Sequence, residues 1–244
     1  MEWVISVVVV LMAALLKGMT GFGFALLAVP LLSLLFPIQS LIPAMTLFNL
    51  ITSVYLLASI KLKVKAKHFV PMLLASFAGI PLGVYVLTYF PEQTLELAAG
   101  ISIFSISMVF LLGGNQPVPE ERRKKPIVFA GFLSGLLTSS MSIGGPPLAL
   151  AMNRKGYSKE SFRKIFALVS VVNAAISSVL YVVHGIFVAF SLKFTIFLLP
   201  VIVLGTKLGD GLSQKVNQLF FRKVILYINL LLGLFIIVRT LVSA

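Results

Sequence analysis

Long apolar segments recur along the whole chain, and this feature most limits what the chain can fold into. Of its 244 residues, 59% are hydrophobic and only 11% are charged, and the mean hydropathy is +1.08. In a soluble domain about a quarter of the residues are charged, whereas a membrane-spanning helix needs roughly 20 mainly apolar residues. We therefore expect a single integral membrane domain, residues 1–244, whose surroundings are the lipid bilayer.

Six uninterrupted apolar segments have the length of a membrane span, at about 41–60, 69–89, 94–112, 165–183, 193–212 and 223–242. None of them alternates polar and apolar residues as a membrane β-strand does, so an all-α polytopic fold is predicted. The N-terminal segment begins with Glu2 and carries no early Lys or Arg. This differs from the basic start of a cleavable signal peptide, and we expect the segment to be retained.

Two further apolar regions are interrupted by helix breakers. Region 4–36 contains "LKGMTGFGF" at 16–24, and region 127–152 contains "SMSIGGPPLAL" at 140–150. Gly and Pro are the residues least compatible with a helix interior. The resulting pieces, about 10 to 16 residues long, are typical of re-entrant or discontinuous membrane helices.

The two broken regions align with each other at an offset of 121 residues, which places Gly23 opposite Gly144. Further along, Asn49 aligns with Asn173 at an offset of 124, and the glycine pair at 79 and 83 aligns with the pair at 205 and 209 at an offset of 126. The alignment predicts repeats at about 1–113 and 126–244, linked by a cytoplasmic loop at 114–125. Each repeat consists of a broken hairpin followed by three spanning helices.

The distribution of charge predicts that the two repeats have opposite orientations. Sixteen of the twenty Lys and Arg residues fall in four clusters, at 61–67, 122–125, 154–164 and 215–223. Clusters between apolar segments mark cytoplasmic loops, and three spans per repeat reverse the orientation of the second repeat. Both termini are then extracytoplasmic. Because this topology accounts for the net charge of +13, no nucleic-acid partner is expected.

Three stretches of the sequence carry a family resemblance: "GMTGFGFALLAVPLL", "GFLSGLLTSSMSIGGPPLALAM" and "FRKIFALVSVVNAAIS". Together with their spacing, they resemble the sulfite exporter TauE/SafE family, also called the TSUP transporters, over essentially the whole chain. The resemblance implies a multi-pass carrier of the bacterial or archaeal cytoplasmic (inner) membrane. The implied substrates are small sulfur-containing anions such as sulfite, sulfonates or sulfoacetate.

Broken helices point to an anion-binding site, because a helix that starts inside the membrane presents free N–H groups and a positive dipole end. The candidate substrate-binding residues are Lys17, Thr20, Gly21, Gly23, Asn49, Ser142, Gly144, Gly145, Pro146 and Asn173. Each has a structural alternative. Glycines permit close helix packing, Lys17 can extend to the membrane surface, the asparagines can join helices, and hydroxyls can bond back to their own helix.

Lys207 and Asp210 lie three residues apart and are candidate coupling residues. We expect either a structural pair near the cytoplasmic surface or a proton-coupling role for Asp210 with Lys207 contacting substrate. His184 is expected in an outer loop, with a proton relay as the alternative.

The favoured function is a secondary transporter that exports a small sulfur-containing anion. The alternatives are proton-coupled uptake of an organosulfur or carboxylate anion, an anion channel, and an intramembrane serine protease using Ser134 or Ser142 with His184. No enzyme activity and no cofactor are expected, because the sequence has no P-loop, no cysteine and only two histidines, too few for a metal site. The sequence favours no particular oligomeric state.

Overall fold

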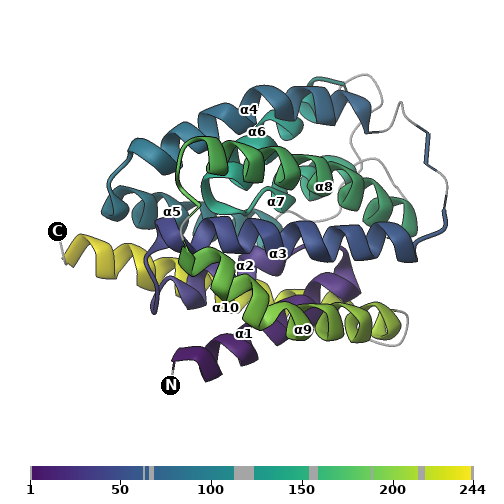
Figure 1. Cartoon of the computed structure of the whole chain (residues 1–244). Coiled ribbons are helices and arrows are strands. Elements are labelled where there is room, and N and C mark those ends of the chain that lie inside the picture. The colour runs from purple at the N-terminus through teal and green to yellow at the C-terminus, as the bar shows by residue number, and fades with distance from the viewer. Residues whose placement is uncertain are drawn as a thin grey trace.

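The structure is a computed structural model, and it describes residues 2–62, 64–65, 69–112, 124–153, 159–187, 189–213 and 218–242. All regular elements in these residues are α-helices, which confirms the predicted fold class (Figure 1). The predicted loop 114–125 lies outside the described residues except for its last two positions. The helices are α1 Glu2–Thr20, α2 Phe24–Leu32, α3 Ile38–Ser59, α4 Val70–Tyr89, α5 Glu92–Leu112, α6 Lys124–Met141, α7 Gly145–Asn153, α8 Lys159–Val183, α9 Ala189–Leu212 and α10 Gln218–Val242.

Helix lengths follow the same order in the two halves of the chain. A helix of 19 residues (α1) or 18 residues (α6) precedes a helix of nine residues (α2 or α7), and three long helices follow. The breaks lie where the sequence predicts them, but the expected length of the first pieces is wrong. A single glycine such as Gly18 is tolerated inside a helix, so α1 continues to Thr20 and reaches a spanning length.

Six helices in the described part of the chain are long and apolar enough to cross a membrane: α1, α3, α4, α5, α8 and α9. Five of them coincide with predicted spans, and the sixth predicted span falls in α10, whose apolar described stretch is shorter, Leu226–Val242. Large apolar side chains on the outer surface are more than half exposed, among them Phe197, Leu204 and Leu231. A surface of this kind is suited to lipid, and the chain is a multi-pass membrane protein.

The main helix pairs each join one helix from the first half of the chain with one from the second half. α1 packs extensively on α9 and α6 on α4, while α3 lies beside α8 and α5 beside α10 (Figure 1). Two of these interfaces depend on glycine, because a Cβ at Gly79 would overlap the Phe132 carbonyl in α6 and one at Gly209 would overlap the Leu15 carbonyl in α1. The glycine pairs that align in sequence therefore make equivalent close contacts.

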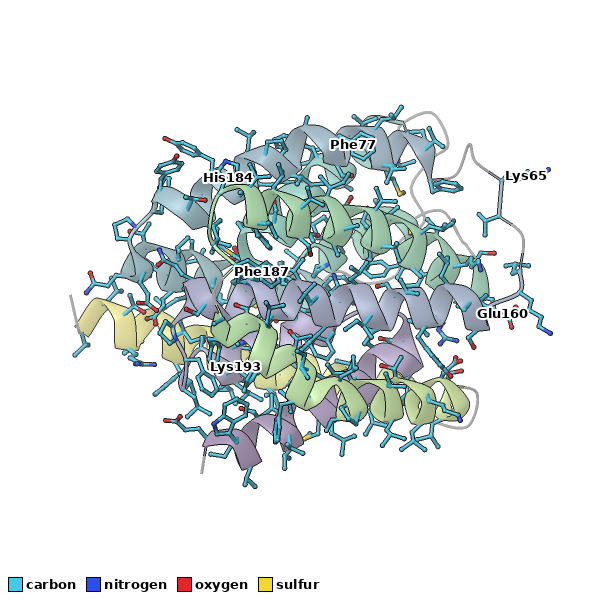
Figure 2. All side chains as sticks on the ribbon, viewed as in Figure 1. Lys65, Phe77, Glu160, His184, Phe187 and Lys193 are labelled. Atoms are coloured by element: carbon cyan, nitrogen blue, oxygen red, sulfur yellow. The ribbon has the colours of Figure 1, made fainter. Side chains whose placement is uncertain are left out.

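α3 and α8 run side by side in opposite directions. At one end, Lys164 near the start of α8 donates to the Ile60 carbonyl just beyond α3, at 2.6 Å. Figure 2 shows Lys65 and Glu160 at this same end and His184 toward the other. We call the end that carries Lys65 and Lys164 the basic end. Opposite directions for α3 and α8 are what an inverted repeat requires, and the orientation in the membrane stays a prediction.

Both termini lie at the end opposite the basic end. The Trp3 ring is 5.0 Å from that of Phe197 in the first half of α9, and Ser191 at the start of α9 donates to the Ser40 carbonyl at the start of α3. Near the C-terminus, Thr240 contacts Glu96 in the first turns of α5 at 3.4 Å. The start of α5 adjoins the start of α3, because the Glu92 carboxylate accepts from the Ile38 N–H at 3.0 Å.

Candidate functional site

The first break is a sharp turn built on two glycines. Gly21 has φ 87° and Gly23 has φ 92°, in the left-handed region that only glycine enters at low cost. The Thr20 hydroxyl lies 2.9 Å from the Leu16 carbonyl and 2.7 Å from the Phe22 carbonyl, so it is engaged within the break. α2 then starts at Phe24 with no side chain capping its free N–H groups.

The second break shares only part of this turn, because Gly144, the counterpart of Gly23, does not have a positive φ. Ser142, which aligns with Gly21 at the offset of 121, has φ 58°. A non-glycine residue in this region costs about 1–2 kcal/mol, which marks Ser142 as a strained position. Its side chain is buried, and its Oγ has no hydrogen-bond partner among the described residues.

The two breaks face each other across a small cavity, which we call the break cavity. Its volume is about 20 Å³, close to the space that one water needs. It is lined by Gly23, Phe24, Ala25, Leu26, Asn49, Ser142, Ile143, Gly145, Pro146 and Phe166. The structure thus brings together five of the predicted site residues: Gly23, Asn49, Ser142, Gly145 and Pro146.

The two short helices contribute unequally to this cavity. The first turn of any α-helix has N–H groups without intrahelical partners, and the helix dipole adds partial positive charge there. The first turn of α2 keeps all of these donors, whereas α7 begins Gly145-Pro146-Pro147 and proline has no N–H. The N-terminus of α2 is therefore the stronger anion-attracting wall.

Lys17 lies behind Asn49 in the protein interior and is only 1% exposed. Its ammonium group donates to the Asn49 carbonyl at 3.0 Å, to Ser53 Oγ at 2.7 Å and to Asn49 Oδ1, so its three donors have three acceptors. The alternative in which Lys17 extends to the membrane surface is wrong. Because Lys17 occupies Oδ1, the polar group left on the Asn49 amide is the Nδ2 donor.

Asn173 is the counterpart of Asn49 but joins helices instead of lining the cavity. Its Oδ1 accepts from Ser76 Oγ at 2.7 Å, and its Nδ2 lies 3.5 Å from Ser134 Oγ. Gly144 also serves packing, since a Cβ there would overlap Thr138 Oγ1 in α6. Gly21 and Thr20 likewise do not line the break cavity.

Asp210 pairs with Arg163 at 2.6 Å. The expected pair of Asp210 with Lys207 is therefore wrong. Ser59 Oγ also donates to the second oxygen of this carboxylate. Lys207 is exposed on the outer surface of α9, where Leu204 and Leu208 are exposed as well. The two candidate coupling residues therefore lie in different surroundings.

Arg163 is the residue that sequence reasoning missed, because it was counted with the basic cluster 154–164. It is buried, and its Nη2 donates to the Gly18 carbonyl at 2.5 Å as well as to Asp210. A signal was present: Arg163, Phe166, Ser170, Asn173 and Ser177 follow the spacing of a single helix face.

Arg163 lines a larger cavity of about 590 Å³ at the basic end, which we call the end cavity. Its lining comes from the end of α3, the start of α8 and the end of α9: Ser59, Ile60, Lys61, Leu62, Glu160, Arg163, Asp210, Gly211 and Ser213.

Of the two histidines in the sequence, His184 lies in the described residues. It is exposed at the end of α8, and its Nδ1 donates to the Leu180 carbonyl at 2.9 Å. His68 lies outside the described residues. Within the residues that the structure describes, no group of three or more His, Cys, Asp or Glu side chains is placed to hold a metal ion.

The chain matches a known protein family. The model of the family described as "Sulfite exporter TauE/SafE" matches residues 6–236, nearly the whole chain. No curated protein matches the chain, and no solved structure does.

Proposed function

The chain belongs to the sulfite exporter TauE/SafE family, and from this premise we propose that it is a secondary transporter that binds a small sulfur-containing oxyanion in the break cavity. The observation that carries the proposal is the meeting of the two helix breaks around one cavity. Residues 121 apart along the chain supply its two sides, as the site of a carrier built from repeats would need.

The chemistry of the cavity wall suits an oxyanion. The groups available there are donors: the free N–H groups of α2, the Ser142 hydroxyl and the Asn49 Nδ2 group. Sulfite and sulfonates present several acceptor oxygens. Lys17 donates a hydrogen bond to Asn49 on the side away from the cavity. Its positive charge favours an anion over a neutral ligand, because charges interact strongly in surroundings of low dielectric constant.

The size of the cavity favours a carrier over a channel. With about 20 Å³ it holds about one water, so α2 and α7 have to move apart before a sulfur oxyanion fits. A channel needs a continuous polar path, whereas a carrier closes around its site between openings to either side. The glycines at 21 and 23 give α2 the backbone freedom for such a movement.

The membrane potential favours export. An inside-negative potential is worth about 2.3 kcal/mol per charge per 100 mV, so a monoanion leaves the cell downhill without a coupled ion. We place the basic end in the cytoplasm and both termini outside, in the inner membrane, by the positive-inside rule. Proton-coupled uptake of an organosulfur or carboxylate anion is the second candidate, and Asp210 in the end cavity would then be the group that takes the proton.

The proposal is tested with purified protein in liposomes. Sulfite loaded inside should leave faster when an inside-negative potential is imposed, and flux of a cation with no flux of any sulfur oxyanion would contradict the proposal. Ser142→Ala removes the free hydroxyl and should raise the half-saturating sulfite concentration by about tenfold, the worth of one hydrogen bond. Ser178→Ala is the matched control, because the Ser178 hydroxyl bonds to its own helix, at the Ala174 carbonyl, and lies outside the break cavity.

A further inference from the structure

Arg163 lies between the end cavity and the break cavity. Its side chain lines the end cavity, and its Cγ lies 2.7 Å from the place of a Cβ on Gly21, the first residue of the first break. Phe166, one helical turn further along α8, lines the break cavity. An ion that moves from the end cavity to the break cavity therefore passes this turn of α8.

Aromatic rings fill the space next to Arg163 on the same turn. Phe22, between the two glycines of the first break, packs against Phe162 with ring centroids 5.8 Å apart and against Phe166 with centroids 5.9 Å apart. The rings offer an anion no hydrogen-bond donor. The Arg163 guanidinium beside them does offer such donors.

The donors of the Arg163 guanidinium are incompletely used. Nη2 serves both the Gly18 carbonyl and one oxygen of Asp210, while Nε is buried and has no partner among the described residues. The Nε and Nη2 groups form one planar edge that matches two oxygens of a single oxyanion. Asp210 contacts only the Nη2 group, and Nε stays available for a second oxygen of an incoming oxyanion.

Asp210 is placed so that another anion can replace it. Its side chain is 17% exposed, against 5% for Arg163, so the carboxylate can be solvated in the end cavity when it leaves the guanidinium. It also keeps a hydrogen bond from Ser59 on α3. The cost of separating the pair is therefore smaller than for two fully buried charges.

We propose that Arg163 is a second oxyanion-binding site, at which a small oxyanion that enters the end cavity replaces Asp210 on the Nε–Nη2 edge. The proposal rests on the proposed function, because the oxyanion is the transported one. Replacement of Asp210 separates α8 from α9 and leaves the ion one helical turn from the break cavity. Before an anion binds, the Arg163–Asp210 pair keeps the path from the end cavity to the break cavity closed.

The first test is the variant Asp210→Asn, with sulfite flux measured in liposomes over a range of sulfite concentrations. Removing the competing carboxylate should lower the half-saturating concentration by about tenfold, the factor that one charge-assisted hydrogen bond provides. Glu96→Gln is the control, because it removes a carboxylate that lies outside both cavities and should leave that concentration within about twofold. An unchanged or higher half-saturating concentration in Asp210→Asn overturns the proposal.

A double variant separates a binding role for Arg163 from a structural one. Arg163→Gln should raise the half-saturating concentration at least tenfold, and Arg163→Gln with Asp210→Asn, a neutral pair that can still hydrogen bond, should leave it raised. If the pair only holds helices together, the double variant restores normal flux, and the proposal is overturned. Arg163→Lys keeps the charge without the planar edge and provides the same test should the glutamine variants fail to fold.

Failure of this proposal can be told from failure of the proposed function. If the unmodified protein moves no oxyanion, the proposed function fails, and sulfite binding to the detergent-purified protein decides about Arg163. Thermal stabilisation by sulfite that is lost in Arg163→Lys supports the site, and stabilisation equal to that of the unmodified protein overturns it. If the unmodified protein transports sulfite and the Arg163 variants are unaffected, this inference alone fails.

Discussion

Replacement of Lys17 by methionine separates the electrostatic role of this residue from its structural one. Lys17→Met keeps the length of the side chain but removes three hydrogen bonds, to the Asn49 carbonyl, Asn49 Oδ1 and Ser53 Oγ. Three bonds from a charged donor contribute about 4.5–9 kcal/mol, and removing a charge from the membrane interior returns about 2.5–3.5 kcal/mol. The net loss in the free energy of unfolding is then about 1–6.5 kcal/mol, so the stability of the variant has to be measured together with its transport.

Lys17→Met should also weaken anion binding, because it removes the attraction between the Lys17 charge and the bound anion. A hydrogen bond, the Asn49 amide and a second hydrogen bond separate the Lys17 ammonium from a bound anion by about 7 Å. Two unit charges at this distance attract by about 2.4 kcal/mol at an effective dielectric constant of about 20. The half-saturating sulfite concentration should therefore rise by about 50-fold in Lys17→Met.

Two measurements check this prediction: sulfite flux in liposomes and the thermal unfolding midpoint in detergent. Lys207→Met is the matched control, because it removes an exposed lysine from α9 that lies outside both cavities. A Lys17→Met protein that folds and keeps the half-saturating concentration of the unmodified protein would refute the electrostatic argument. A change of equal size in Lys207→Met would attribute the effect to overall charge.

Three further predictions address the breaks and the topology. Ser142→Gly relieves a strained backbone and should raise the free energy of unfolding by about 1 kcal/mol while weakening sulfite binding, because the hydroxyl is lost. Gly144→Ala places a methyl group on Thr138 Oγ1 and should lower the free energy of unfolding by about 1–3 kcal/mol, as thermal unfolding would show; an unchanged midpoint would contradict the close packing. Reporter fusions at positions 38 and 158 should report opposite sides of the membrane, and a same-side result would exclude the inverted repeat.

The site is asymmetric although the two halves have matching helices. At the offset of 121, Thr138 occupies the position of Lys17, so the second half has no ammonium group at the place where the first half buries one. The prolines at 146 and 147 remove donors from α7, while α2 keeps its own. The backbone arrangement is therefore nearly shared between the halves, whereas the attraction for an anion comes mainly from the first.

The helices and both breaks were predictable from the sequence because they depend on local properties. The length and hydropathy of a segment decide whether it forms a spanning helix, and the Gly and Pro residues at 21, 23 and 144–147 are unfavourable in a helix interior. The boundary of α1 was less predictable, since Gly18 stays helical and Gly21 does not, although both are glycines. That difference depends on what each glycine packs against.

The burial of Arg163 was not predictable from its position in a basic cluster. Lys and Arg are common at the cytoplasmic ends of membrane helices, and the cluster 154–164 has that composition whether its members face water or protein. Its contacts are with Gly18 and Asp210, which are 145 and 47 residues away. Only the tertiary structure brings the Arg163 side chain of α8 to residues of the paired helices α1 and α9.

The sequence by itself determined an all-α membrane protein, the places of its two breaks and its family, because hydropathy and backbone conformation act over a few neighbouring residues. Only the tertiary structure decided which residues at the breaks face the cavity: Gly145 does, whereas its neighbour Gly144 packs against α6. It also decided that Lys17 bonds to Asn49 and that Asp210 pairs with Arg163. These outcomes depend on the rotation of each helix about its axis and on partners from distant helices, which no local pattern specifies.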